Sequence, residues 1–265
     1  MGSHTVDWSA LRVPAAGVRE ATGRRERHKR ATRQLLIDTA TEMFLERGFD
    51  AVTVVEIAEV CDVSPTTVFN YFPTKEALVL DLPQELLDAL RAALADPATT
   101  PLAGMARILA GELDNLTAWL EAQKDKAWAA GAVQRFEAMV RDTPALQAHH
   151  RNMLQQMTTV ACEVLAHRAG LDPGDPEPQI AAAALIGLWN VQVNSSCKHL
   201  DGRRSPARVR DAVTADVRRA VDLLGTGLAI FPADAERDDP AHDTATAESA
   251  AGSPGTTFVL FKQAR

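Results

Sequence analysis

The spacing of helix-start signals between Thr53 and Phe72 constrains this chain more than any other feature of its sequence. Thr53 is followed three residues later by Glu56, which is the capping-box pattern at the start of a helix. After a short turn, Ser64 and Pro65 give a second start, with a capping hydroxyl and then a proline at the first helical position. Two helices of about eight residues joined by a short turn form a helix-turn-helix, whose second helix enters the major groove of DNA. The spacing therefore predicts a DNA-binding head.

The residues inside this segment divide into an apolar set and a polar set. The apolar residues are spaced to form the seam between the two helices: Ile57, Val60, Val68 and Phe72. The polar residues are uncharged and are expected to face outward: Thr66, Thr67, Asn70 and Tyr71. Such side chains hydrogen-bond to base edges and phosphates. An ordinary solvent-exposed helix face is the alternative interpretation.

The rest of the chain also favours helices. Aromatic residues make up only 5% of the sequence, and alanine and leucine dominate. A helix is expected from Arg24 to Gly48, and another begins at Thr74, is kinked or split at Pro83 with Asp81 as the cap of a restart, and continues through Leu94. Further helices are expected over 101–120, around 122–130, and over 144–170, 179–199 and 206–224. The predicted fold is all-α, with a three-helix helix-turn-helix head and a six-helix regulatory bundle, in a dimer.

This pattern predicts four parts along the chain. They are a flexible arm (1–23), the DNA-binding head (24–80), a ligand-binding and dimerisation domain (81–231), and an acidic, disordered tail (232–265). The sequence has no signal-peptide core, no apolar run of membrane-spanning length and an odd number of widely spaced cysteines. A cytoplasmic protein with no membrane partner is therefore expected.

Charge is distributed unevenly around the head. Between Gln34 and Asp81 there are nine acidic and two basic residues, so attraction to phosphate has to come from elsewhere. A basic run precedes this segment, and we expect it to contact the DNA backbone or the minor groove: Arg24, Arg25, Arg27, Lys29 and Arg30. A solvated helix face is the alternative.

Residues 26–82 resemble the DNA-binding domain of the tetracycline-repressor (TetR/AcrR) family. The matching positions are Ala40, Phe44, Gly48, Phe49, Thr53, Ile57, Ala58, Val63, Ser64 and the run Phe72-Pro73-Thr74-Lys75-Glu76-Ala77-Leu78. The resemblance implies a homodimer that binds a palindromic operator and is released when a small molecule enters the C-terminal half. An activator of transcription is the alternative to a repressor, and the sequence does not distinguish the two.

The resemblance also implies roles for single residues. The side chains implied to face DNA are Ser64, Thr66, Thr67, Asn70 and Tyr71, while Lys75 is implied to meet a phosphate. Thr53 is implied to cap a helix whose N-terminus can also hold a phosphate. Two positions depart from the family pattern: Phe69 replaces a common tyrosine, and Asp62 replaces a common turn glycine, although aspartate tolerates a left-handed conformation.

The C-terminal half carries no catalytic group at recognisable spacing, and no cofactor or metal is expected. Bulky apolar residues and two asparagines one turn apart are the candidates to line a cavity for an apolar or acyl-type effector: Trp119, Trp128, Phe136, Met139, Met153, Met157, Trp189, Asn190 and Asn194. Each of them can equally be a core or interface residue. A regulator controlled by a protein partner is the alternative, and a helical-bundle enzyme is disfavoured because no acid/base cluster is found.

The last two long helices are expected to pair with their mates in the dimer. The residues named for this interface are small or aliphatic: Ala181 to Ala184, Leu185, Leu188, Val191, Val209, Val213, Val217 and Leu224.

Overall fold

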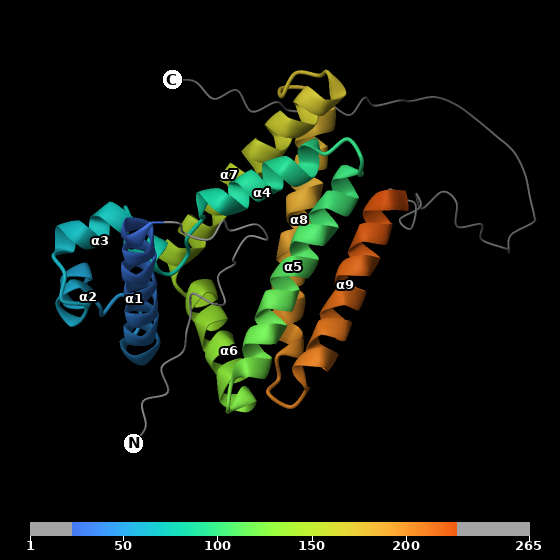
Figure 1. Ribbon diagram of the computed structural model, residues 1–265. Helices are drawn as coiled ribbons and strands as arrows, with labels where there is room; N and C mark the ends of the chain where they lie inside the picture. The colour runs from blue at the N-terminus through green and yellow to red at the C-terminus, as the bar shows by residue number, and fades with distance from the viewer. Residues whose placement is uncertain (1–22, 227–265) are drawn as a thin grey trace, which may run out of the picture. The chain divides into compact units, whose positions relative to one another are not determined.

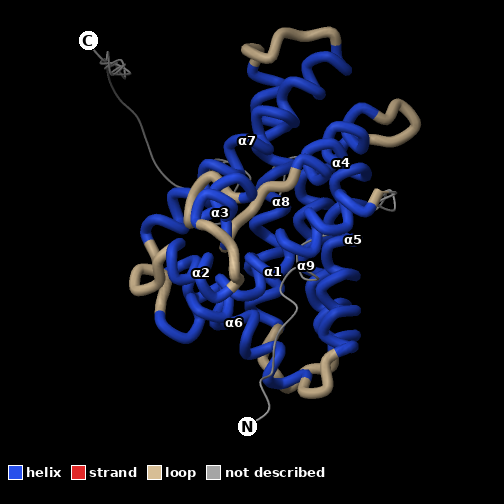
Figure 2. The backbone as a smooth tube through the Cα atoms, turned by 60° about the vertical axis from the view of Figure 1, so that its left-hand side comes forward, coloured by secondary structure: helices blue, strands red, loops and turns tan. Residues whose placement is uncertain are grey.

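The computed structural model describes residues 23–226, and every regular element in that range is helical (Figure 1, Figure 2). The head consists of α1 (Arg24–Arg47), α2 (Val54–Val60) and α3 (Pro65–Tyr71). A short 3-10 helix, η1 (Glu76–Leu78), leads to six further helices: α4 (Gln84–Ala95), α5 (Pro101–Ala122), α6 (Lys126–Asp142), α7 (Pro144–Ala169), α8 (Pro176–His199) and α9 (Pro206–Thr226). The all-α prediction is confirmed. Nearly all of the predicted arm and all of the predicted tail lie outside the described residues.

Side-chain caps fix both ends of the turn in the head. The Thr53 hydroxyl accepts from the Glu56 amide at 3.2 Å, and the Glu56 carboxylate accepts from the Thr53 amide at 2.7 Å. Ser64 accepts from the Thr67 amide at 3.1 Å and begins α3. Between these caps, Asp62 has a φ of 53°. The predicted capping box, the second cap and the left-handed aspartate are therefore confirmed.

The seam between α2 and α3 differs from the prediction at one residue. Ile57, Val68 and Phe72 are buried, but Val60 is 65% exposed. Cys61 takes the buried position because residues four apart lie on one helix face, and its amide still bonds to the Ile57 carbonyl at 3.0 Å. The prediction for Val60 was wrong.

The proline after the head splits the predicted helix. Pro83 occupies the N-cap position of α4, where its fixed φ and missing N–H cost little. Contrary to the prediction, Asp81 does not cap this helix, because its carboxylate forms an ion pair with Arg33 of α1. The ion pair therefore connects the segment between η1 and α4 to α1.

The helices of the bundle pack in two groups. α5, α8 and α9 run side by side, while α4 packs on α5 and α7 (Figure 1). At Gly104 of α5 a Cβ atom would lie 2.5 Å from the carbonyl oxygen of Ala93, so glycine permits the close approach of α4.

Two bundle helices are longer than predicted. α6 runs from Lys126 to Asp142 instead of ending near Ala130, because buried residues recur on one face as far as Val140. Its start is fixed by the Asp125 carboxylate, which accepts from the Trp128 amide at 2.9 Å. α8 begins at Pro176, three residues before the predicted start.

Most of the apolar residues that we assigned to a dimer interface lie inside the single chain. The buried ones are Ala182, Leu185, Leu188, Val209, Val213 and Val217. They are covered because α8 and α9 pack on each other and on α5. A large apolar side chain that α8 does expose is Ile180, which is 71% accessible.

Candidate DNA-reading surface and ligand cavity

The outer face of α3 carries polar but uncharged groups. Thr66 and Asn70 are exposed, and Ser64 is exposed at the helix start. The Thr67 hydroxyl is half-buried and lies 2.9 Å from the Ser64 hydroxyl. This surface offers hydrogen-bond donors and acceptors to base edges and has no charge of its own.

Phe69 is a further exposed side chain of α3, and sequence reasoning did not include it among the candidate contacts. Its side chain is 50% exposed. An exposed aromatic ring in a recognition helix can touch the methyl group of thymine. The signal was available, because Phe69 lies one turn from Thr66 and is adjacent to Asn70.

Three other predicted contacts have partners within the head. The Lys75 ammonium donates to the Phe49 carbonyl at 2.5 Å and lies 4.2 Å from the centre of the Phe49 ring. Tyr71 is half-buried against the core instead of facing fully outward. The Thr53 hydroxyl donates to Glu56 at 2.9 Å. DNA contacts by these residues remain predictions.

Glu56 keeps a negative charge at the start of α2. Arg47 and the Thr53 cap hold the pKa of its carboxyl down to about 2, since they stabilise the charged form. The Glu56 carboxylate already accepts from the Thr53 amide. A phosphate at this N-terminus would therefore have to displace a carboxylate.

Basic side chains cover the first turns of α1. Those of Arg25, Arg27, Lys29 and Arg30 are exposed, and the side chain of Arg24 lies outside what the structure describes. Farther along, the Arg33 guanidinium stacks 4.5 Å from the centre of the Phe72 ring. Arg33 therefore connects α1, the end of α3 and, through Asp81, the segment that leads to the bundle.

The head and the bundle meet at two further places. The imidazole Nε2 of His149, on α7, lies 2.9 Å from the Leu80 carbonyl oxygen. In addition, α6 contacts α1. These contacts connect α6 and α7 directly to the head.

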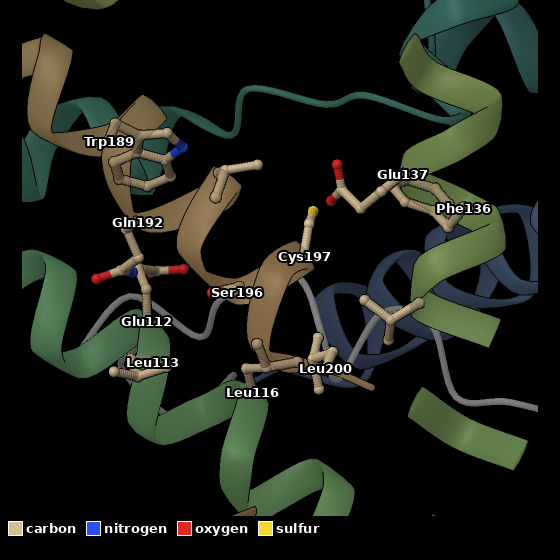
Figure 3. A pocket seen from close by; sticks show the side chains of 12 residues that line it. Glu112, Leu113, Leu116, Phe136, Glu137, Trp189, Gln192, Ser196, Cys197 and Leu200 are labelled. Atoms are coloured by element: carbon tan, nitrogen blue, oxygen red, sulfur yellow. The ribbon is translucent and has the colours of Figure 1, made fainter. Parts of the chain in front are cut away.

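A cavity of about 180 Å³ lies between α5, α6 and α8 (Figure 3). Its apolar lining comes from Leu113, Leu116, Val133, Phe136, Trp189, Val193 and Leu200. Its polar lining comes from Glu112, Glu137, Gln192, Ser196 and Cys197. A mainly apolar wall with a few polar groups is typical of a small-molecule site.

The titratable groups of this cavity are shifted by burial. Burial raises the pKa of Glu112 to about 7. It also raises the pKa of Glu137 to about 7, against the attraction of Arg141. The pKa of the Cys197 thiol rises to about 11, first through burial and then through the charge of Glu137. Glu137 points from α6 toward Cys197 in Figure 3.

Only part of the predicted ligand set reaches this cavity. Phe136 and Trp189 line it. The other seven do not: Trp119, Trp128, Met139, Met153, Met157, Asn190 and Asn194. Trp119 and Met157 are instead buried in the core, and Asn194 is exposed. Their proposed role as ligand contacts has no support from the position of the cavity.

The cavity residues that sequence reasoning missed follow a helical period. Along α8 the lining positions are 189, 192, 193, 196, 197 and 200, which lie on one helix face. Starting from Trp189, this period would have found Gln192 and Ser196. It would also have passed over Asn190, which lies about 100° around the helix from Trp189.

Among residues 23–226, no helix combines the length and the apolar character needed to cross a membrane.

Comparison with known proteins gives matches to both halves of the chain. The model of bacterial regulatory proteins of the tetR family matches residues 36–82, and the model of the MftR C-terminal domain matches residues 117–229. The transcriptional regulator TcmR of Streptomyces glaucescens is 32% identical over 180 residues, which cover 64% of this chain and 74% of TcmR.

Two further matches are more limited. RutR of Escherichia coli K12 is 35% identical over 72 residues, which cover 27% of this chain and 34% of RutR. The crystal structure of NalD, the secondary repressor of the MexAB-OprM multidrug efflux pump in Pseudomonas aeruginosa, aligns with a TM-score of 0.43 at 21% identity. That alignment covers 72% of this chain and 97% of NalD.

Proposed function

Because the chain belongs to the TetR family of bacterial regulatory proteins, we propose that it is a repressor that binds operator DNA as a homodimer and is released by a small molecule. The observation that carries the proposal is the presence, in one chain, of an exposed reading helix and a partly open cavity whose wall helix α6 also contacts α1. The protein acts in the cytoplasm, where its operator lies.

In this proposal α3 reads the operator. Thr66 and Asn70 hydrogen-bond to base edges, and Phe69 contacts a thymine methyl group. Ser64 and Thr67 keep the helix start in shape, since they bond to each other. The exposed basic residues at the start of α1 supply phosphate contacts, which position the head without reading sequence.

Coupling between cavity and head runs through the contacts of α6, α7 and the 79–83 segment. A ligand that binds one arrangement of α6 more tightly than another shifts the population of head positions. The ion pair of Arg33 with Asp81 and the contact of His149 with Leu80 then transmit that shift to α1 and η1. These contacts have to differ between the DNA-bound and ligand-bound states.

The alternative of a regulator controlled by a protein partner predicts a solid bundle. A cavity lined by Trp189 favours a small molecule instead. In this proposal the protein is a repressor and not an activator. A ligand that releases it from the operator then relieves repression.

A DNA-binding titration tests the proposal. The full chain, shown to be a dimer, is titrated against a labelled duplex from upstream of its own gene, with fluorescence anisotropy as the readout. Asn70→Ala and Thr66→Ala should each weaken binding by about 5- to 150-fold, since a good base contact contributes about 1–3 kcal/mol. Asn152→Ala, at an exposed position on α7, is the matched control and should bind like the parent.

The salt dependence of binding should be the same for parent and Asn70→Ala, because no charge is removed. Parent-like affinity in both α3 variants, or no specific binding at low salt, would contradict the proposal.

A further inference from the structure

Two carboxyl groups enter the cavity from different helices, Glu112 from α5 and Glu137 from α6. Among the described residues, neither has a hydrogen-bond partner or an ion-pair partner within 4 Å. The nearest basic influence is Arg141, which attracts Glu137 but is exposed and forms its own ion pair with Asp142 at 3.3 Å. The cavity lining contains no basic residue.

Both residues are partly buried in a partly open cavity, so each unpaired carboxylate loses some of its hydration and costs free energy. A carboxylate in an apolar enclosure loses hydration that only a partner charge or hydrogen-bond donors can replace. Here burial keeps both acids partly protonated near neutral pH. A bound cation would offset this cost, since it supplies a partner charge to the carboxyl group that it contacts.

The other polar groups point to the same kind of ligand. The Gln192 side-chain amide nitrogen donates to the Leu109 carbonyl at 2.9 Å, which leaves its oxygen to accept. Trp189 and Phe136 add aromatic rings to the wall, and a ring face attracts a cation within about 6 Å of its centre. The cavity therefore combines hydrogen-bond acceptors with aromatic rings.

We propose that the effector is a small organic cation, a protonated amine or quaternary ammonium on a flat apolar frame, held between Glu112 and Glu137 with its frame against Trp189 and Phe136. This inference rests on the proposed function, since it names the ligand class of the same cavity. It keeps the apolar frame expected from the sequence but replaces an acyl-type anionic group by a cation, because an anion in this cavity would face two carboxyl groups.

The volume of the cavity limits the size of the effector. The cavity of about 180 Å³ is smaller than the range of about 300–1,000 Å³ that is usual for drug-sized ligands. This volume favours a small cation over a drug-sized one.

Three probes of similar shape test the charge preference. They are naphthylmethyl-trimethylammonium, its neutral carbon isostere neopentylnaphthalene, and the anion naphthylacetate, each titrated into the full-length dimer by calorimetry. The cation should bind at least about tenfold more tightly than the isostere, and the anion should bind most weakly.

The double variant Glu112→Gln/Glu137→Gln should lose at least about tenfold in affinity for the cation. Its affinity for the neutral isostere should change much less. Glu163→Gln, an exposed carboxyl on α7, is the matched control and should keep the parent's preference. Circular dichroism checks that each variant is folded. If the double variant does not fold, the titrations are repeated with Glu112→Gln and Glu137→Gln separately.

Three results would overturn the inference: no binding of the cation to the parent, equal or tighter binding of the isostere or the anion, or an unchanged cation preference in a folded double variant. Operator binding by the parent, measured without any probe, tests the proposed function separately. A chain that binds DNA but prefers the neutral probe refutes only the ligand class.

Discussion

The short helices of the head begin differently from the two longest helices of the bundle, although α5 and α6 of the bundle also start at capping side chains, Thr100 and Asp125. α2 and α3 have seven residues each, and both begin at a side chain that accepts from the backbone three residues later. α7 and α8 have 26 and 24 residues, and neither has a side-chain cap bond at its start. Short helices are marginal in water and need such local bonds, whereas long amphipathic helices are held by packing.

The same contrast applies to the two functional surfaces. The reading surface lies on one short helix, so its residues are neighbours in the sequence. The cavity is assembled from three helices, and its lining runs from Glu112 to Leu200. Local bonds therefore determine the first surface, while the second exists only when the whole bundle is packed.

The largest expected effect tests whether the head can be damaged alone. Phe72 is 1% exposed and packs under Arg33, so Phe72→Ala should destabilise the head by about 3–5 kcal/mol and abolish DNA binding. Hydrogen exchange followed by mass spectrometry should show reduced protection in α1–α3 and retained protection in α5 and α8. Phe69→Ala, at a half-exposed position of the same helix, should leave protection unchanged. Equal reduction in both regions would mean that head and bundle unfold as one.

The second test separates charge from sequence reading. Replacing Arg25, Arg27, Lys29 and Arg30 by glutamine should weaken operator binding by about 100-fold at moderate salt. The slope of the logarithm of affinity against the logarithm of salt concentration should become shallower by about 0.9 for each phosphate that is no longer neutralised. The matched control removes four exposed basic residues of the bundle, namely Arg135, Arg151, Arg208 and Arg218. An equal weakening in control and variant would show that net charge matters, and not the position of the basic residues on α1.

The sequence predicted the head well because its signals are local. Thr53 and Glu56, or Ser64 and Pro65, lie within three residues of each other, so their geometry follows from helix rules alone. The resemblance in residues 26–82 is confirmed by the family match over 36–82. Val60 was misplaced because the buried face of α2 runs through Ile57, Ala58 and Cys61, and the spacing alone did not decide between positions three and four residues after Ile57.

The cavity could not be predicted in the same way. Glu112 and Glu137 look like ordinary surface charges in the sequence, and only packing of α5 and α6 on α8 brings them to one cavity. Phe136 and Trp189 were named because bulky apolar side chains can line a cavity, but this property does not distinguish a cavity wall from a core. Trp119 and Met157 share that property and are buried in the core.

The third test uses pH, because the buried acids distinguish the bundle from the head. Folded Glu112 and Glu137 keep their protons up to about pH 7, whereas the ordinary pKa is 4.5, so their contribution to stability falls as the pH rises through this window. The Glu112→Gln/Glu137→Gln variant does not have this pH-dependent destabilisation. Two pKa values displaced from 4.5 to about 7 correspond to at most about 7 kcal/mol, and solvent contact of the partly exposed carboxyl groups reduces this. At about pH 8 the variant should therefore be more stable than the parent by about 2–3 kcal/mol, or roughly 4–12 °C in Tm, and near pH 4 the difference should vanish.

Other groups leave this comparison intact. The pKa of Glu56 in the head is lowered to about 2, so its contribution changes only at acid pH. Burial lowers the pKa of His150, but the parent and the variant both contain this residue. Its contribution therefore cancels in the stability difference between them. Glu163→Gln is again the control. A Tm difference that does not depend on pH would mean that the two acids are not held protonated by burial.

The smallest expected effect tests the difference in helix ends directly, with the same substitution at two N-cap threonines. Thr53→Ala removes the hydroxyl that accepts from the Glu56 amide and should cost about 1 kcal/mol, with faster hydrogen exchange at the start of α2. Thr143→Ala, at the N-cap of α7, removes no cap bond and should cost much less. Chemical denaturation and hydrogen exchange measure both variants under the same conditions. Equal costs would mean that local caps do not distinguish the head from the bundle, and that α2 is held by packing on α1 and α3 as the long helices are held by their neighbours.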